Sequence, residues 1–296
     1  MGKPRWSERP PPTAEPVSTA ALLADAARRL GRVTDNAHFE ALGLLWEITG
    51  VDPASLLAFP ERRVPVAVVA ALEECIGRRE LGEPFAYIVG TRGFHAQLLF
   101  VDSAVLIPRP ETELLVENAL ERCARLVQPS LLDLGTGSWA IAIAVKASRP
   151  DMHVVGTDVS EAAIGVAREN CINLSLSEPD LCPRWIVSSW FAALSVRFDI
   201  IVCNPPYVCS ADIKGSLTFE PRVALDGGVD GLDAYRVLLA EAPEHLNPGG
   251  ALLLEHGAEQ RETITDLARA TGWRVVRALD DLAGRPRVLE LDRGAP

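Results

Sequence analysis

The sequence has no apolar segment long enough to cross a membrane and no secretory signal. No run of eighteen apolar residues occurs in the 296-residue chain, whereas a membrane-spanning helix needs about 20. Residues 1–16 are rich in proline and charge and have no apolar core of the signal-peptide type. We therefore expect a cytoplasmic protein that has no membrane partner and begins with a disordered tail over 1–16.

Paired cysteines and dense basic runs are also absent. The six cysteines are scattered, with no C-x-x-C pair and no histidine at zinc-ligand spacing: Cys75, Cys123, Cys171, Cys182, Cys203 and Cys209. This usage predicts reduced thiols and no metal site. The net charge of −11 and the lack of a Lys/Arg cluster argue against a nucleic-acid partner, although they do not exclude a local basic patch.

The first third of the chain has the apolar spacing and capping residues of short helices. The patterns predict helices from Ser18 to Gly31, from Asp35 to Gly50, from Asp52-Pro53 onward and over 64–77. Short helices joined by tight turns favour a small antiparallel bundle over 17–83. Two apolar stretches follow, at 85–89 and 94–101, separated by a Gly-Thr-Arg-Gly turn, and they predict a β-hairpin linker over 84–107.

From residue 108 onward, strand and helix patterns alternate. Strands are expected at 131–134, 153–157, 185–187, 199–203, 251–255, 273–278 and 287–291, and helices at 111–127, 138–148, 160–173, 232–246 and 257–271. This alternation predicts an α/β, Rossmann-like catalytic domain over 108–296, with a mostly parallel sheet.

A glycine loop in this domain points to a nucleoside cofactor. Asp133-Leu134-Gly135-Thr136-Gly137-Ser138 lies between a strand and a helix, where glycine lets the backbone approach a ligand closely. Asp158 ends the next strand, and an acidic residue there can accept hydrogen bonds from ribose hydroxyls. Both NAD and S-adenosylmethionine fit, because Ala140 can fill the last position of a dinucleotide fingerprint.

A second motif, Asn204-Pro205-Pro206-Tyr207, follows the apolar strand at 199–203. It is thus expected at the carboxyl edge of the sheet, where such folds bind ligands. The Asn204 side-chain oxygen and the Pro205 carbonyl can accept the two N–H bonds of one NH₂ group, and Tyr207 can cover its flat face. Positioning then supplies most of the rate without a strong general base.

With these motifs in order, the chain resembles the protein-(glutamine-N5) methyltransferases, the HemK/PrmC-type enzymes that modify peptide chain release factors. The resemblance covers nearly everything after the tail. It rests on Leu106-Ile107-Pro108-Arg109-Pro110-Glu111-Thr112-Glu113, on residues 84–90, 133–138, 204–207 and 220–228, and on residues 230–236 and 281–285.

The resemblance implies a helical bundle for substrate recognition, a hairpin and a methyltransferase domain that binds S-adenosylmethionine. The implied partner is a release factor, methylated on the glutamine of a Gly-Gly-Gln loop. The implied cofactor-binding residues are Asp133, Gly135, Thr136, Gly137, Ser138, Trp139, Asp158, Trp190 and Asn204. The implied catalytic and substrate-binding residues are Asn204, Pro205, Pro206 and Tyr207.

Two positions depart from the family pattern, and both fall at the cofactor. Trp139 replaces the third glycine of the loop, where its side chain can point into the core, reshape the pocket or weaken binding. Ser189 stands where an acidic residue usually precedes Trp190, so a weaker neutral hydrogen bond is expected there.

Two alternatives remain open at this stage. One is a nucleic-acid amino-methyltransferase, since an exocyclic NH₂ resembles an amide. The other is a divergent or non-catalytic homologue that binds or methylates another amide or amine. We expect structural roles for His95, His153 and His256 and assign none to Glu255, and the oligomeric state is not predicted.

Overall fold

The computed structural model describes residues 17–174 and 183–294, so the expected tail lies outside the described residues. The chain divides into two compact units, Met1–Gly90 and Thr91–Pro296. None of the helices in the described ranges combines the length and apolarity needed to cross a membrane.

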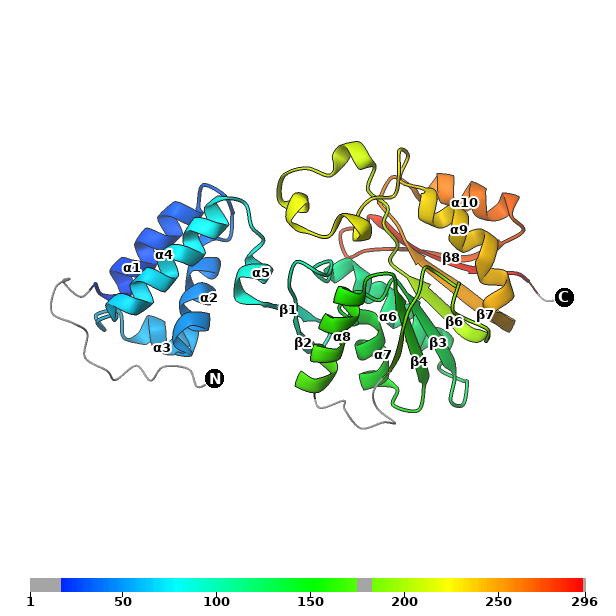
Figure 1. Cartoon of the computed structure of the whole chain (residues 1–296), viewed down its shortest axis with the longest axis horizontal. Coiled ribbons are helices and arrows are strands. Elements are labelled where there is room, and N and C mark those ends of the chain that lie inside the picture. The colour runs from blue at the N-terminus through cyan, green and yellow to red at the C-terminus, as the bar shows by residue number, and fades with distance from the viewer. Residues whose placement is uncertain (1–16, 175–182, 295–296) are drawn as a thin grey trace. The chain divides into compact units, whose positions relative to one another are not determined.

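The first unit is a group of short helices (Figure 1). They are α1 (Thr19–Leu30), α2 (Ala37–Thr49), α3 (Pro53–Ala58), α4 (Val66–Glu80) and α5 (Phe85–Val89). Two of the predicted N-caps are present, because Ser18 accepts from the backbone N–H of Ala21 and Asp52 from that of Ser55. Leu30, Leu45 and Leu72 lie at the centre of the apolar core.

The prediction of a strand at 85–89 was wrong. These residues form α5, which begins after Pro84 and ends at Gly90 in the left-handed conformation, with φ of 74°. The ring of Phe85 packs so close to Gly43 that a Cβ there would stand 2.8 Å from it. Packing against α2 thus overrides the β-propensity of the segment.

A hairpin is present, but further along the chain than predicted. It pairs β1 (Thr91–Phe94) with β2 (Gln97–Phe100) in antiparallel register. His95 turns the chain between them, with φ of 51°. The hairpin belongs to the second compact unit, so the segment 84–107 is split between a helix of the first unit and this pair of strands.

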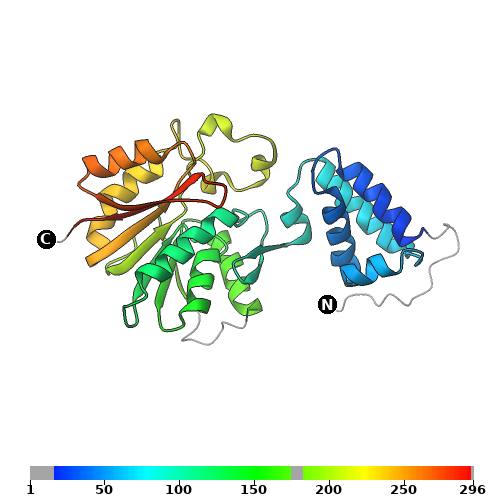
Figure 2. The ribbon, with the colours of Figure 1, turned by 180° about the vertical axis from the view of Figure 1, so that it is seen from behind.

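The second unit is built on a seven-stranded sheet in the order β5-β4-β3-β6-β7-β9-β8. Figure 2 shows the ribbon from behind the view of Figure 1. The strands are β3 (Ser130–Leu134), β4 (His153–Asp158), β5 (Arg184–Val187), β6 (Phe198–Cys203), β7 (Leu246–Glu255), β8 (Arg274–Asp280) and β9 (Pro286–Asp292). β9 is antiparallel to both of its neighbours, while β3 to β7 pair in parallel. The predicted Rossmann-like fold class is confirmed.

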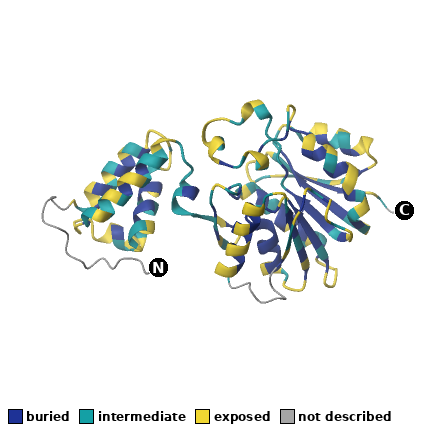
Figure 3. Cartoon of the chain, viewed as in Figure 1, coloured by how far each residue is buried: buried dark blue, intermediate teal, exposed yellow. Residues whose placement is uncertain are grey.

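Helices cover both faces of this sheet (Figure 1). α6 (Glu113–Arg122), α7 (Ala140–Ser148) and α8 (Glu161–Asn173) share one apolar core, and α9 (Asp233–Glu241) and α10 (Arg261–Ala270) share the other. Successive residues of a strand point to opposite faces, so Ile200 lies in the first core and Ile201 in the second. β3, β6 and β9 are accordingly buried along most of their length, whereas the edge strands β5 and β8 are not (Figure 3).

Two predicted boundaries moved where prolines interrupt the backbone pattern. The helix expected over 232–246 ends at Glu241 and continues as a 3-10 turn, Ala242–His245, which contains Pro243. The strand expected at 251–255 is longer than predicted, because β7 already begins at Leu246, includes Pro248 and has an irregular register against β6.

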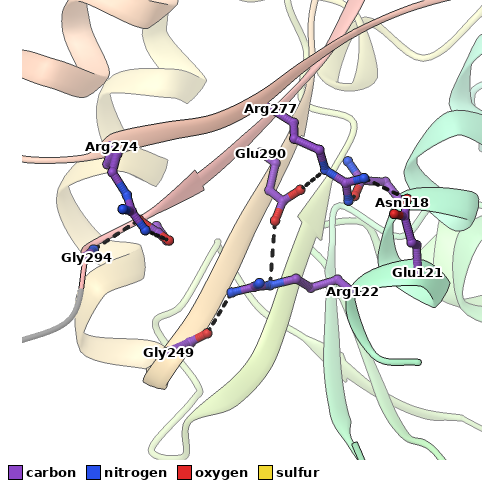
Figure 4. Close-up of polar contacts among 9 residues, drawn as sticks. Asn118, Glu121, Arg122, Gly249, Arg274, Arg277, Glu290 and Gly294 are labelled. Carbon is purple, nitrogen blue, oxygen red and sulfur yellow. Dashed lines mark hydrogen bonds and ion pairs between the residues drawn. The ribbon is translucent and has the colours of Figure 1, made fainter. Parts of the chain in front are cut away.

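The buried carboxylate of Glu290 links the antiparallel strands β8 and β9 to α6 through ion pairs (Figure 4). The side chain of Glu290 on β9 is 1% exposed and pairs with Arg277 of β8 at 2.6 Å and with Arg122 of α6 at 3.5 Å. Arg277 also pairs with Glu121, and Arg122 donates to the carbonyl of Gly249. A buried charge needs such partners, because burying it without them costs several kcal/mol, about 20 by the idealised estimate.

Candidate active site

The candidate site lies at the carboxyl ends of β3, β4 and β6, where the strand order reverses. β3 has β4 on one side and β6 on the other, so the loops that leave these strands diverge and open a crevice. A cavity of about 450 Å³ occupies this place. The predicted residues that line it are Gly135, Thr136, Gly137, Ser138, Asp158, Trp190, Asn204, Pro205 and Pro206.

The glycine loop is hydrogen-bonded to the buried side chain of Asp133. Gly135 and Gly137 take φ of 69° and 54°, which strain most other residues. The Thr136 hydroxyl donates to Asp133 at 2.6 Å. Burial raises the pKa of Asp133 to about 7, and the hydrogen bond from Thr136 opposes the rise. Asp133 lies outside the cavity lining and shapes the loop instead.

Asp158 joins the loop to the next helix. Its carboxylate accepts from the backbone N–H of Gly137 at 2.9 Å and of Ser160 at 2.8 Å. Burial raises its pKa, while these hydrogen bonds lower it. Because Asp158 also lines the cavity, it presents an acceptor there at a fixed place.

Trp139 points into the core and not into the cavity. It has the left-handed φ of 70° that suits a glycine, at a cost of about 1 kcal/mol. Its side chain is fully buried and packs on Trp185, with ring centroids 5.1 Å apart. Of the three outcomes that the sequence left open for Trp139, the structure therefore shows a side chain that points into the core.

Trp190 and Ser189 both line the cavity. Trp190 also has a positive φ, of 46°, so the backbone turns sharply after β5 and presents both residues to the same space. Ser189, one of the two positions that depart from the family pattern, places a neutral hydroxyl group there in place of the usual acidic side chain.

Asn204 connects the large cavity to a smaller one. A cavity of about 360 Å³ is lined by Asn204, Tyr207, Arg109 and Glu220, among others. Tyr207 lies in this second cavity and outside the lining of the first. Burial raises the pKa of Tyr207 to about 12, so its phenol stays protonated at neutral pH.

Four residues at the site were not predicted individually. Asn204 donates from Nδ2 to the Thr112 hydroxyl at 3.1 Å, and Thr112 contacts the buried Glu255. Glu220, 3% exposed, accepts from the backbone N–H of Ile107 and pairs with Arg109 at 2.5 Å. Three of the four belong to motifs that carry the family resemblance, which was the available signal. Glu255 had only its place at the end of a strand.

None of the histidines lines the large cavity. His95 and His153 are exposed, and His256 is buried with Nδ1 2.8 Å from the carbonyl of Gly257. Within residues 17–174 and 183–294, no group of three His, Cys, Asp or Glu side chains can hold a metal ion.

Comparison with known proteins identifies the family. Residues 21–90 match the PrmC N-terminal domain, and residues 110–220 match the methyltransferase small domain. A release factor glutamine methyltransferase of Xylella fastidiosa is 41% identical over 275 residues, which cover 92% of this chain and 96% of that protein. The chain belongs to the release factor glutamine methyltransferase family.

Another relative agrees with that assignment. The family member from Bordetella pertussis is 42% identical over 256 residues, which cover 85% of this chain and 93% of that protein. A methyltransferase from Pyrococcus furiosus shares the fold, with a TM-score of 0.50 and 21% identity over 66% of this chain and 88% of that one. The predicted family is confirmed, and the chain is a methyltransferase.

Proposed function

We propose that this methyltransferase transfers a methyl group from S-adenosylmethionine to the side-chain amide nitrogen of a glutamine in a peptide chain release factor. One observation carries the proposal: Asn204 lines both cavities. A cofactor in the larger cavity and a glutamine side chain in the smaller one would meet at this residue.

The residues of the larger cavity fit S-adenosylmethionine. Asp158 offers a carboxylate to ribose hydroxyls, Trp190 offers a flat apolar surface to adenine, and the glycine loop lets the backbone approach the methionine part. When bound, this cofactor supplies an electrophilic methyl group on a sulfonium. Trp139 does not line the cavity, because its ring is buried and packs on Trp185.

The chain itself positions the acceptor amide. The Asn204 oxygen and the Pro205 carbonyl accept its two N–H bonds and favour a pyramidal nitrogen whose lone pair faces the methyl group. The nitrogen gains a methyl group and releases one proton to water. Tyr207 forms a neutral wall and is not the base, since burial keeps its phenol protonated. Positioning of this kind can supply about 7 kcal/mol or more of the barrier reduction.

The helical unit is proposed to recognise the release factor. Phe39 and Trp46 lie two turns apart on α2, and their exposed fractions are 70% and 51%. Exposed aromatic side chains on one helix face are typical of protein contact surfaces. A release factor partner implies action in the cytoplasm, where translation takes place.

Mass spectrometry of a recombinant release factor after reaction with S-adenosylmethionine tests the proposal. We expect one added methyl group on the glutamine of its Gly-Gly-Gln loop. The Asn204→Ala protein should lose about 100-fold or more in kcat, the size of loss seen elsewhere when one hydrogen bond to a transition state is removed. Asn173→Ala, an exposed site at the end of α8, is the matched control. Methyl transfer to DNA alone would reject the proposal.

A further inference from the structure

Three side chains from distant parts of the chain meet beside the proposed amide site, and one of them, Thr112, lines the larger cavity. Asn204 follows β6, Thr112 ends the 3-10 turn Pro110–Thr112 before α6, and Glu255 is the last residue of β7. Nδ2 of Asn204 donates to Oγ1 of Thr112 at 3.1 Å, and the Thr112 side chain lies close enough to the carboxyl of Glu255 to oppose the rise of its pKa. The three groups form a chain of neighbouring polar side chains that ends in a buried acid.

The acid at the end of this chain has few other contacts. Glu255 is 1% exposed, and its Oε2 has no hydrogen-bond partner among the residues the structure describes. The nearby phenol of Tyr235 donates to the main-chain carbonyl of Glu255 and not to its carboxylate. Burying a carboxyl group that has one side-chain partner costs free energy. That cost is unusual for a residue whose only role is to end a strand.

The chemistry of these groups gives the chain a direction. An ionised carboxylate only accepts hydrogen bonds, so the single hydrogen of the Thr112 hydroxyl must point toward Glu255. The Thr112 oxygen can then only accept from Asn204, which must turn its NH₂ toward it. Oδ1 of Asn204 consequently faces the opposite way, toward the space that both cavities share.

We propose that Thr112 and Glu255 are positioning residues for methyl transfer, which together hold the Asn204 side chain with its oxygen toward the acceptor nitrogen. The inference rests on the proposed function for its substrate. Without the hydroxyl, the Asn204 amide can rotate by half a turn and present NH₂ to the NH₂ of the substrate. Two donors would then face each other, and the acceptor amide would lose one of the hydrogen bonds that orient its lone pair.

The variant Thr112→Val tests this directly, because valine has nearly the shape of threonine without its hydroxyl. We expect kcat to fall about 10- to 100-fold, as for other hydrogen bonds that orient reacting groups. The affinity for the cofactor should stay within about twofold of the wild type, which corresponds to at most about 0.4 kcal/mol of binding free energy. Thr112→Ser should recover most of the rate. Thr271→Val, which removes a surface hydroxyl bonded to Leu267, is the matched control. A folded Thr112→Val protein with wild-type kcat would overturn the proposal.

A second measurement does not depend on catalysis. The NMR signals of the Asn204 side-chain NH₂, assigned by their absence from the Asn204→Asp protein, should show slow hydrogen exchange in the wild type. Thr112→Val should accelerate that exchange, and Thr112→Ser should restore it. Equal exchange in wild type and Thr112→Val contradicts the hydrogen-bond chain. Absence of methylated release factor with slow exchange intact would reject only the proposed function.

The pH dependence of kcat distinguishes a positioning role of Glu255 from a purely structural one. Desolvation raises the pKa of Glu255 to about 7, so its carboxylate forms near neutral pH. The ionisable groups that influence it are Arg109, Glu111, Cys203, Tyr207, Tyr235 and Arg287. We expect kcat of the wild type to rise between pH 6 and 8, and that rise to be lost in Glu255→Gln, whose amide can donate as well as accept. An unchanged profile in Glu255→Gln would show that Glu255 does not act through Thr112.

Discussion

The indole of Trp139 occupies space that exists only because residue 156 is a glycine. A Cβ built on Gly156 would stand 2.8 Å from the indole nitrogen of Trp139. That nitrogen has no hydrogen-bond partner in the part of the chain the structure describes. The large residue in the loop and the small one in β4 are therefore complementary, and the departure from the family pattern is accommodated by the core.

This complementarity predicts how the two positions respond to substitution. Gly156→Ala should destabilise the protein by about 2 kcal/mol through overpacking. In a Trp139→Gly background the same substitution should cost at least about 1 kcal/mol less. Urea unfolding of the four proteins gives the coupling free energy. Additive effects would mean that the indole and residue 156 do not compete for space.

Trp139→Gly by itself should not improve cofactor binding. It removes a buried ring, which costs about 3 kcal/mol or more, and relieves only about 1 kcal/mol of left-handed backbone strain. We expect a lower midpoint of unfolding and an S-adenosylmethionine affinity within a fewfold of the wild type by calorimetry. A large gain in affinity would instead show that Trp139 obstructs the cavity.

Asp158→Ala should weaken the binding of S-adenosylmethionine. The carboxylate is proposed to accept from the ribose, and a hydrogen bond to a charged group contributes about 1.5–3 kcal/mol, or roughly 10- to 100-fold in affinity. Asp266→Ala, an exposed residue of α10, is the control and should leave affinity unchanged. Titration calorimetry measures both. Equal affinities for the two variants would remove Asp158 from the cofactor site.

Asp133 should make stability decrease as the pH rises toward neutrality. Burial raises its pKa from 3.8 to about 7 in the folded protein, so the folded state holds a proton that the unfolded state has lost. Its contribution is fully present below about pH 4, falls between pH 4 and 7, and amounts to at most about 4 kcal/mol. Asp133→Asn should flatten this part of the profile in urea unfolding at pH 4 to 7. Identical slopes in both proteins would contradict the buried, protonated state.

Arg109→Ala should destabilise the wall of the smaller cavity. Glu220 is almost fully buried and, among the residues the structure describes, would keep the hydrogen bond from Ile107 alone. Loss of one partner of a buried pair costs about 3–5 kcal/mol, and we expect about 2 kcal/mol here because Arg109 is one-third exposed. The KM for the release factor should also rise. Arg269→Ala, from an exposed pair, should cost close to zero.

Local sequence patterns determined much of the second unit. The alternation of strands and helices from residue 108 is encoded in side-chain periods that each segment carries by itself. Because parallel strands end at one edge, the order of the motifs was enough to predict that the glycine loop, Asp158 and Asn204 gather there. The structure brings them to one cavity.

Tertiary structure decided what those periods do not encode. The segment Phe85–Val89 is helical because Phe85 packs against α2, and Trp139 turns inward because Gly156 leaves room for it. The hydrogen bond from Asn204 to Thr112 spans 92 positions in the chain. Contacts between distant residues and the pKa values set by their burial depend on which surfaces the fold brings together. The sequence by itself therefore determined the family and the edge of the sheet that carries the site, while only the folded chain decided which side chains support Asn204 and which way Trp139 points.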